Sequence, residues 1–71
     1  MKKEVKPKEI ARALQKLGFY KLYQKGSHLR LAHPDGRKAT IAIHSKPISK
    51  GTFSAILRQT KLTKKDLNKL I

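Results

Sequence analysis

FYKLYQKGSHLRLAHPDGRKATIAIH, residues 19–44, is the stretch that decides the fold, because polar and apolar side chains alternate along it between two turns. Gly26-Ser27 predicts a two-residue type II′ hairpin turn, and residues 33–36 (HPDG) predict a second turn. Strands are therefore expected over residues 19–25, 28–32 and 38–44. Together they predict a three-stranded antiparallel meander.

A helix is predicted before this stretch. Pro7 suits the first turn of a helix, and Ile10, Leu14 and Leu17 follow with helical spacing. Gly18 fits the left-handed residue that ends many helices. The first helix is therefore expected to end just before the first strand.

Two helices are predicted after the meander. Ser49 can cap a helix whose apolar positions are Phe53, Ile56 and Leu57. Thr63, with an acidic residue three positions later, predicts a cap for a last short helix. The apolar positions of that last helix are Leu67, Leu70 and Ile71.

The expected fold is α+β, in the order α-β-β-β-α with a short C-terminal helix. Both main helices can then cover one face of the sheet and leave the other face open. The chain has 71 residues, so one small domain over residues 1–71 is expected. It has no cysteine, signal-peptide pattern or long apolar run, so a reduced, cytoplasmic location away from membranes is expected.

The charge of the chain points to a polyanion as its partner. Eighteen Lys and Arg residues against four acidic residues give a formal net charge of +14. Solubility alone needs a net charge of only about 2 to 8 in magnitude. RNA or DNA is therefore the first expectation. An anionic membrane surface is less well supported, since no helix sets its lysines opposite a broad apolar face.

The alternation predicts which side chains share the uncovered face. A two-residue turn pairs Lys25 with His28 and Tyr23 with Arg30, and Leu22 is expected opposite Leu31 on the core side. The residues expected on the uncovered face are Lys21, Tyr23, Lys25, His28, Arg30, Lys38, Thr40 and His44. The residues expected on the covered face are Tyr20, Leu22, Leu29, Leu31, Ala39, Ile41 and Ile43. Cations, an aromatic ring and two imidazoles are thus expected on one surface.

His28 is the candidate catalytic residue, because metal-free RNA cleavage by the neighbouring ribose 2′-OH needs a base near that hydroxyl. Lys25 and Arg30 are placed to hold the phosphate. His44 is either a general acid beside the first turn or a solvated residue at the end of a strand. Tyr23 either stacks an unpaired base or covers the sheet. His33, with the opposite parity to His28, is interpreted as structural.

Other enzyme classes find little support in the sequence. The four acidic residues are scattered, whereas two-metal nucleases need clustered carboxylates. Three histidines without HxxxH spacing make no zinc site, and no cofactor is expected. There is no cysteine nucleophile and no glycine-rich nucleotide loop.

Four segments in this order resemble the HicA family of mRNA interferase toxins. They are residues 25–28 (KGSH), 33–37 (HPDGR), 41–44 (IAIH) and 51–59 (GTFSAILRQ). The resemblance covers residues 10–70. It implies a fold similar to a double-stranded-RNA-binding domain, a ribonuclease whose essential histidine is His28, and a HicB-like antitoxin partner.

Two positions depart from the family pattern. Ala42 stands where the third strand of the family commonly has proline, so a more regular strand end is expected. Thr60-Lys61 stands where many members have Ala-Gly, which removes the easy left-handed stop of the second helix.

The function predicted from the sequence is a toxin-type, metal-independent endoribonuclease acting on single-stranded mRNA. The residues expected to contact RNA are Lys21, Tyr23, Lys25, Gly26, Ser27, Arg30 and Lys38. The alternatives are a non-catalytic RNA-binding module that uses the same face, and an adaptor that docks an acidic protein.

Overall fold

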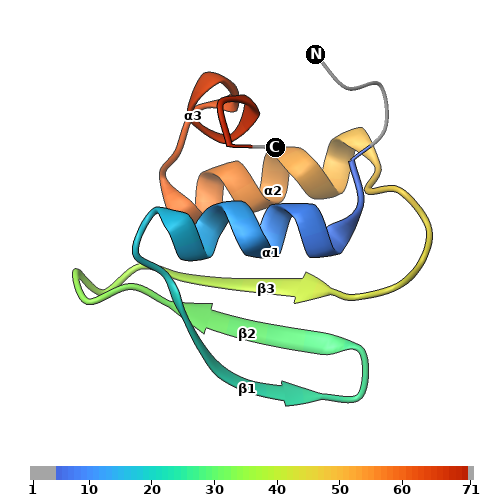
Figure 1. The fold of residues 1–71 in the computed structure, drawn as a ribbon, viewed down its shortest axis with the longest axis horizontal. Helices are drawn as coiled ribbons and strands as arrows, with labels where there is room; N and C mark the ends of the chain where they lie inside the picture. The colour runs from blue at the N-terminus through green and yellow to red at the C-terminus, as the bar shows by residue number, and fades with distance from the viewer. Residues whose placement is uncertain (1–4, 71) are drawn as a thin grey trace.

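The computed structural model describes residues 5–70. Its elements are α1 (Pro7–Lys16), β1 (Tyr20–Lys25), β2 (His28–Ala32), β3 (Lys38–Ala42), α2 (Lys50–Thr60) and α3 (Lys64–Asn68) (Figure 1). This order confirms the predicted α+β class. Ile71, predicted as an apolar residue of the last helix, lies outside the described residues. α2, the longest described helix, has 11 residues, and no helix within residues 5–70 combines the length and apolar content needed to cross a membrane.

The three strands form an antiparallel sheet in the order β1-β2-β3. β3 lies beside the helices, whereas β1 is the outer edge (Figure 1). The core between sheet and helices comprises Ile10, Ala11, Ala13, Leu14, Phe19, Leu29, Leu31, Ala39, Ile41, Ile56 and Leu67. Every residue of β1 is exposed, so the helices cover chiefly β2 and β3.

Local signals begin and end the helices as the sequence predicts. Pro7 is the first residue of α1, and Gly18 follows it with φ +102°. Ser49 caps α2, because its side chain accepts a hydrogen bond from the Thr52 N–H at 3.2 Å. Thr63 and Asp66 cap α3 reciprocally, at 3.1 and 3.0 Å.

The first hairpin has the predicted two-residue turn. Gly26 has φ +59°, and Lys25 pairs with His28 on either side of the turn. Among the described residues Lys61 is the only non-glycine with positive φ, so Ser27 has the negative φ that a type II′ turn requires at its second position. The predicted pair of Tyr23 with Arg30 is also present.

The predicted register of the first half of β1 is wrong. Lys21, not Leu22, lies opposite Leu31, and Leu22 is the extra residue of a β-bulge. Tyr20 and Leu22, expected on the covered face, are 48% and 44% exposed. Lys21 pairs with Leu31 and therefore belongs to the covered side of the sheet. Tyr20 pairs with Ala32 and takes the place of Lys21 on the uncovered side.

The burial of Phe19 explains this bulge. Phe19 is only 3% exposed and contacts His33 edge-on, with 5.0 Å between the ring centroids. Phe19 and Tyr23 are four positions apart, so a regular strand would direct both to the same face. One inserted residue lets Phe19 enter the core while Tyr23 stays on the uncovered face.

β3 ends at Ala42 rather than at the predicted His44. Ala42 pairs with His28, the first residue of β2, so the next residue has only the turn opposite it. The Ile43 N–H donates to the Ser27 carbonyl at 2.6 Å, which keeps the chain beside the first turn beyond the strand.

α2 ends at Thr60 without the glycine that commonly follows a helix. Lys61 adopts the left-handed conformation instead, with φ 56°. The Arg37 Nη1 donates to the Thr60 carbonyl at 2.6 Å, so the turn between β2 and β3 also holds this helix end.

Candidate functional site

The side of the sheet away from Leu29, Leu31 and Ile41 is called here the open face. Directly opposed residues of an antiparallel sheet project to the same face, so three rows of residues cross it. Starting at the first turn, the rows are Lys25–His28–Ala42, Tyr23–Arg30–Thr40 and Tyr20–Ala32–Lys38.

The first two rows enclose a hollow of about 340 Å³. Its lining residues are Tyr23, Lys25, His28, Arg30 and Thr40. Arg30 is partly buried, and its Nη1 donates to the Thr40 Oγ1 at 3.1 Å, which orients the guanidinium across the sheet. The structure therefore places an imidazole, two cations, an aromatic ring and a hydroxyl around one open space.

His28 is exposed and is the first residue of β2, directly after the Gly26-Ser27 turn. The turn fixes its position, because the pairs on both sides of β2 start at this residue. An imidazole so placed is accessible to a ligand in the hollow.

The structure brings together Tyr23, Lys25, His28 and Arg30, four of the residues predicted from the sequence. Lys38 lies on the same face in the third row. Thr40, which the alternation placed on this face without a role, joins the hollow as the hydrogen-bond partner of Arg30.

Other predicted residues lie around the hollow or away from it. Gly26 and Ser27 form the turn that connects Lys25 to His28. The prediction that Lys21 shares the open face is wrong, because the bulge pairs it with buried Leu31. His44 is exposed, lies two residues beyond the end of β3 and does not line the hollow.

His33 has the structural position expected for it. Its Nε2 is 3.2 Å from the Leu17 carbonyl, and its Nδ1 accepts a hydrogen bond from the Asp35 N–H at 3.2 Å. A Cβ added at Gly18 would lie 2.7 Å from the His33 Nε2, so Gly18 is required here by contact as well as by its φ. His33 thereby joins the end of α1 to the second turn.

Arg37 is a residue whose role the sequence did not indicate. Its Nε donates to the Asp35 Oδ2 at 2.8 Å, and its guanidinium carbon lies 5.1 Å from the centre of the Phe19 ring. The hydrogen bond from the Arg37 backbone N–H, together with its guanidinium, lowers the pKa of Asp35. Arg37 therefore stabilises the second turn and is engaged away from the open face. Its bond to Thr60 spans 23 positions, which no local pattern predicts.

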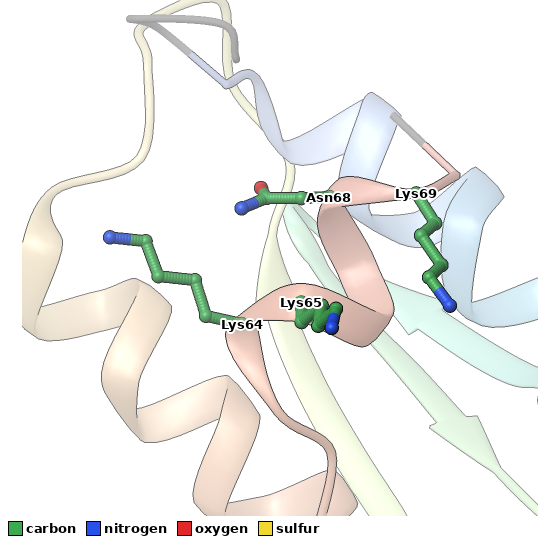
Figure 2. A pocket seen from close by; sticks show the side chains of 4 residues that line it. All are labelled: Lys64, Lys65, Asn68 and Lys69. Atoms are coloured by element: carbon green, nitrogen blue, oxygen red, sulfur yellow. The ribbon is translucent and has the colours of Figure 1, made fainter.

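Two further hollows lie outside the open face. One is lined by Lys64, Lys65, Asn68 and Lys69 of the last helix and the turn after it. Figure 2 shows Lys64 and Asn68 extending to the same side of α3, whereas Lys69 points to the other side. The second, of about 240 Å³, lies between α1 and the sheet and is lined by Lys8, Ala11, Arg12, Gln15, Gln24, Leu29 and Ile43. Neither contains a histidine.

Metal-ligating side chains do not cluster in the described part of the chain. No three His, Asp or Glu side chains within residues 5–70 lie close enough together to hold a metal ion.

Most of the chain matches a known protein family. A family model described as the HicA toxin of bacterial toxin-antitoxin systems matches residues 7–62, which is more than half of the chain. The matched region contains the open face, α1 and α2, whereas α3 follows it. No curated protein matches the chain.

Proposed function

This chain belongs to the HicA toxin family of bacterial toxin-antitoxin systems, and we propose that it acts by cleaving single-stranded mRNA with His28 as the catalytic base. The observation that carries the proposal is the hollow in which His28 meets Lys25 and Arg30. Membership of the family makes the chain a toxin. The cleavage chemistry is the part that we infer from the residues.

The proposed reaction uses the RNA as its own nucleophile. His28 removes the proton of a ribose 2′-OH, and the oxygen attacks the adjacent phosphorus. The bond from phosphorus to the 5′ oxygen breaks, that oxygen takes up a proton, and the products are a 2′,3′-cyclic phosphate and a 5′-OH. No metal ion is needed for this sequence of bonds.

Lys25 and Arg30 stabilise the negative charge that develops on the phosphate. Both line the hollow with His28, and the bond to Thr40 holds the Arg30 guanidinium in place before substrate arrives. Lys25, paired directly with His28, also carries a proton that the departing 5′ oxygen can accept.

The rest of the open face is proposed to bind the RNA chain. Lys38 adds a cation in the third row, and Gly26 and Ser27 present the turn beside His28. The formal net charge of +14 attracts a polyanion to the whole molecule. Lys21 is left out of this set because it faces the covered side.

The partner of this toxin is an antitoxin, as in other toxin-antitoxin systems. We propose that a HicB-like protein inhibits it by covering the open face. α1 and α2 occupy the opposite side of β2 and β3, so the open face is where a partner can exclude RNA by occupancy.

The proposed function is tested by incubating the purified protein with single-stranded RNA in the presence of a metal chelator. Cleavage that persists in chelator and is lost in His28→Ala supports the proposal, and His44→Ala serves as the matched control. A mobility shift without cleavage would replace the enzyme with a non-catalytic RNA-binding module. Neither a shift nor cleavage would point to a protein adaptor instead.

A further inference from the structure

We propose that single-stranded RNA runs along all three rows of the open face, from His28 to Tyr20 and Lys38, and that its unpaired bases stack on Tyr23 and Tyr20. Tyr20 is then a contact that distinguishes unpaired RNA from paired RNA. This inference rests on the proposed function. It adds the path that the RNA takes across the sheet and the contacts that its bases make.

The β-bulge at Leu22 is the first observation. It places Tyr20 opposite Ala32, in the same line of β2 residues as Arg30 and His28. Without the bulge, Lys21 would occupy this face and Tyr20 would point to the core side. The irregularity therefore exchanges a lysine for an aromatic ring on the open face.

The exposure of the tyrosines is the second observation. Tyr20 is 48% exposed and Tyr23 58%, and with Leu22 they are the large hydrophobic residues that β1 exposes. Ala32 lies on the same face yet is 4% exposed, which agrees with the long side chains of Tyr20 and Lys38 on either side of it. Both rings are thus accessible to a ligand on the open face.

The composition of the rows is the third observation. Each row contains one cation and one ring. The cation and the ring are neighbours in two rows, Lys25 beside His28 and Arg30 beside Tyr23. In the third row, Ala32 lies between Lys38 and Tyr20. A cation suits a phosphate and a tyrosine ring suits a base, so the second and third rows each offer the two contacts that one nucleotide needs. In the first row, Lys25 and His28 act on the phosphate and ribose that react.

The spacing of the rows fits a nucleic acid strand. Successive rows are two strand residues apart, about 6.8 Å, so the outer rows are separated by about 13.6 Å. A stacked strand advances about 3.4 Å per nucleotide, so this length holds several stacked nucleotides or fewer extended ones. Paired bases are stacked inside a duplex and do not reach the tyrosines, so the face favours single strands.

The test compares RNA that has bases with RNA that lacks them. Binding is measured in a His28→Ala background, which prevents cleavage, with a single-stranded oligonucleotide and with an abasic oligonucleotide of equal length. Tyr20→Ala is expected to weaken binding of the first by about 5- to 150-fold, the range for loss of one base stack. Binding of the abasic oligonucleotide is expected to stay within about twofold, because its phosphates remain in contact.

Two variants control for structure and for charge. Tyr20→Phe keeps the ring and is expected to retain full affinity, and it remains informative if Tyr20→Ala does not fold. Lys21→Gln, on the other side of the sheet, is expected to have the same small effect on both oligonucleotides.

The outcomes separate this inference from the proposed function. Unchanged affinity of folded Tyr20→Ala for the oligonucleotide with bases, while the parent still binds and cleaves RNA, overturns the path and leaves the function standing. An equal loss for both oligonucleotides also overturns it, because Tyr20 would then act on the fold. Failure of the parent to bind single-stranded RNA overturns both.

Discussion

At the scale of single residues, His28 and His44 differ in their position relative to the strands and the hollow. His28 begins β2, where pairing on both sides sets its position, and it lines the hollow with two cations. His44 follows the end of β3 and lies outside that hollow. This difference in position is the reason that we propose His28, rather than His44, as the catalytic base.

His28→Ala is predicted to lower the rate of RNA cleavage by about 10²- to 10⁴-fold, the usual contribution of a general acid or base. His44→Ala is predicted to cost less than about tenfold, because its side chain lies outside the hollow. Single-turnover cleavage by the two purified variants, with circular dichroism to check folding, measures both effects. Equal losses would make His44 a catalytic partner, and full activity of folded His28→Ala would contradict the mechanism.

At the scale of elements, two helix ends affect the stability of the fold. α2 is followed by Lys61 with φ 56°, a conformation that an L-residue adopts at a cost and glycine adopts freely. α3 begins with a reciprocal pair of hydrogen bonds between Thr63 and Asp66.

Lys61→Gly is predicted to raise the free energy of unfolding by about 1 kcal/mol, because it removes the left-handed strain. Arg12→Gly, at an exposed position within α1, is predicted to lower it by about 1 kcal/mol, since glycine is unfavourable inside a helix. Urea unfolding of the two variants measures both changes. Destabilisation by Lys61→Gly would mean that the lysine side chain stabilises this helix end more than its backbone strains it.

Stability is predicted to fall in acid through Asp66 and Asp35. Hydrogen bonds from the Thr63 backbone and side chain lower the pKa of Asp66, and the Arg37 backbone N–H chiefly lowers the pKa of Asp35. The unfolded state then binds protons more readily, so the stabilisation is present above the ordinary pKa of 3.8 and is lost as the pH falls through the lower folded values.

Melting temperatures between pH 6 and pH 2 test this prediction, with the double variant Asp35→Asn, Asp66→Asn as the control that keeps every histidine. The parent is expected to lose stability more steeply than the control below about pH 4. Parallel curves for the two proteins would show that these carboxylates do not cause the acid sensitivity.

At the scale of the whole molecule, the cationic side chains differ in their surroundings. Arg37 is engaged with Asp35 and Thr60, whereas Lys25, Arg30 and Lys38 share the open face. Lys64, Lys65 and Lys69 are further cations, located at α3 and the turn after it (Figure 2). Binding of a polyanion can therefore involve one surface or two.

The salt dependence of RNA affinity is predicted to reflect the number of phosphates that the open face contacts. Three cations at about −0.7 each give a slope of log affinity against log salt concentration near −2 for a single strand. Lys25→Gln with Arg30→Gln is predicted to reduce the slope to about −0.7 and to weaken binding to all sequences alike. A flat response would remove electrostatics as the driving force, and a much steeper one would bring in the lysines around α3.

The antitoxin is predicted to protect the open face. Hydrogen exchange of the toxin with and without its partner is expected to slow around His28 and Arg30, because an acidic surface is attracted to the cations there. Cross-linking of Lys25 and Lys38 to the partner provides a second measurement. Protection confined to residues 53–59 of α2, with His28 still accessible, would show that inhibition acts through the fold.

Much of this protein is determined by short-range pattern in the sequence. Turn and cap residues set the order of the elements, and the two-residue turn at Gly26-Ser27 leads directly to the pairs Lys25 with His28 and Tyr23 with Arg30. Those residues share a face because side chains alternate along each strand outward from the turn. Counting these alternate positions needs no knowledge of the rest of the chain. The centre of the candidate site could therefore be predicted.

Only the tertiary structure decided what lies farther from that turn. The bulge at Leu22 exists because Phe19 is buried against His33, and it moves Tyr20 onto the open face and Lys21 off it. β3 stops at Ala42 because β2 begins at His28. These features follow from contacts between segments distant in the sequence. The pattern of a single strand does not show which distant residue will pack against it and shift its register.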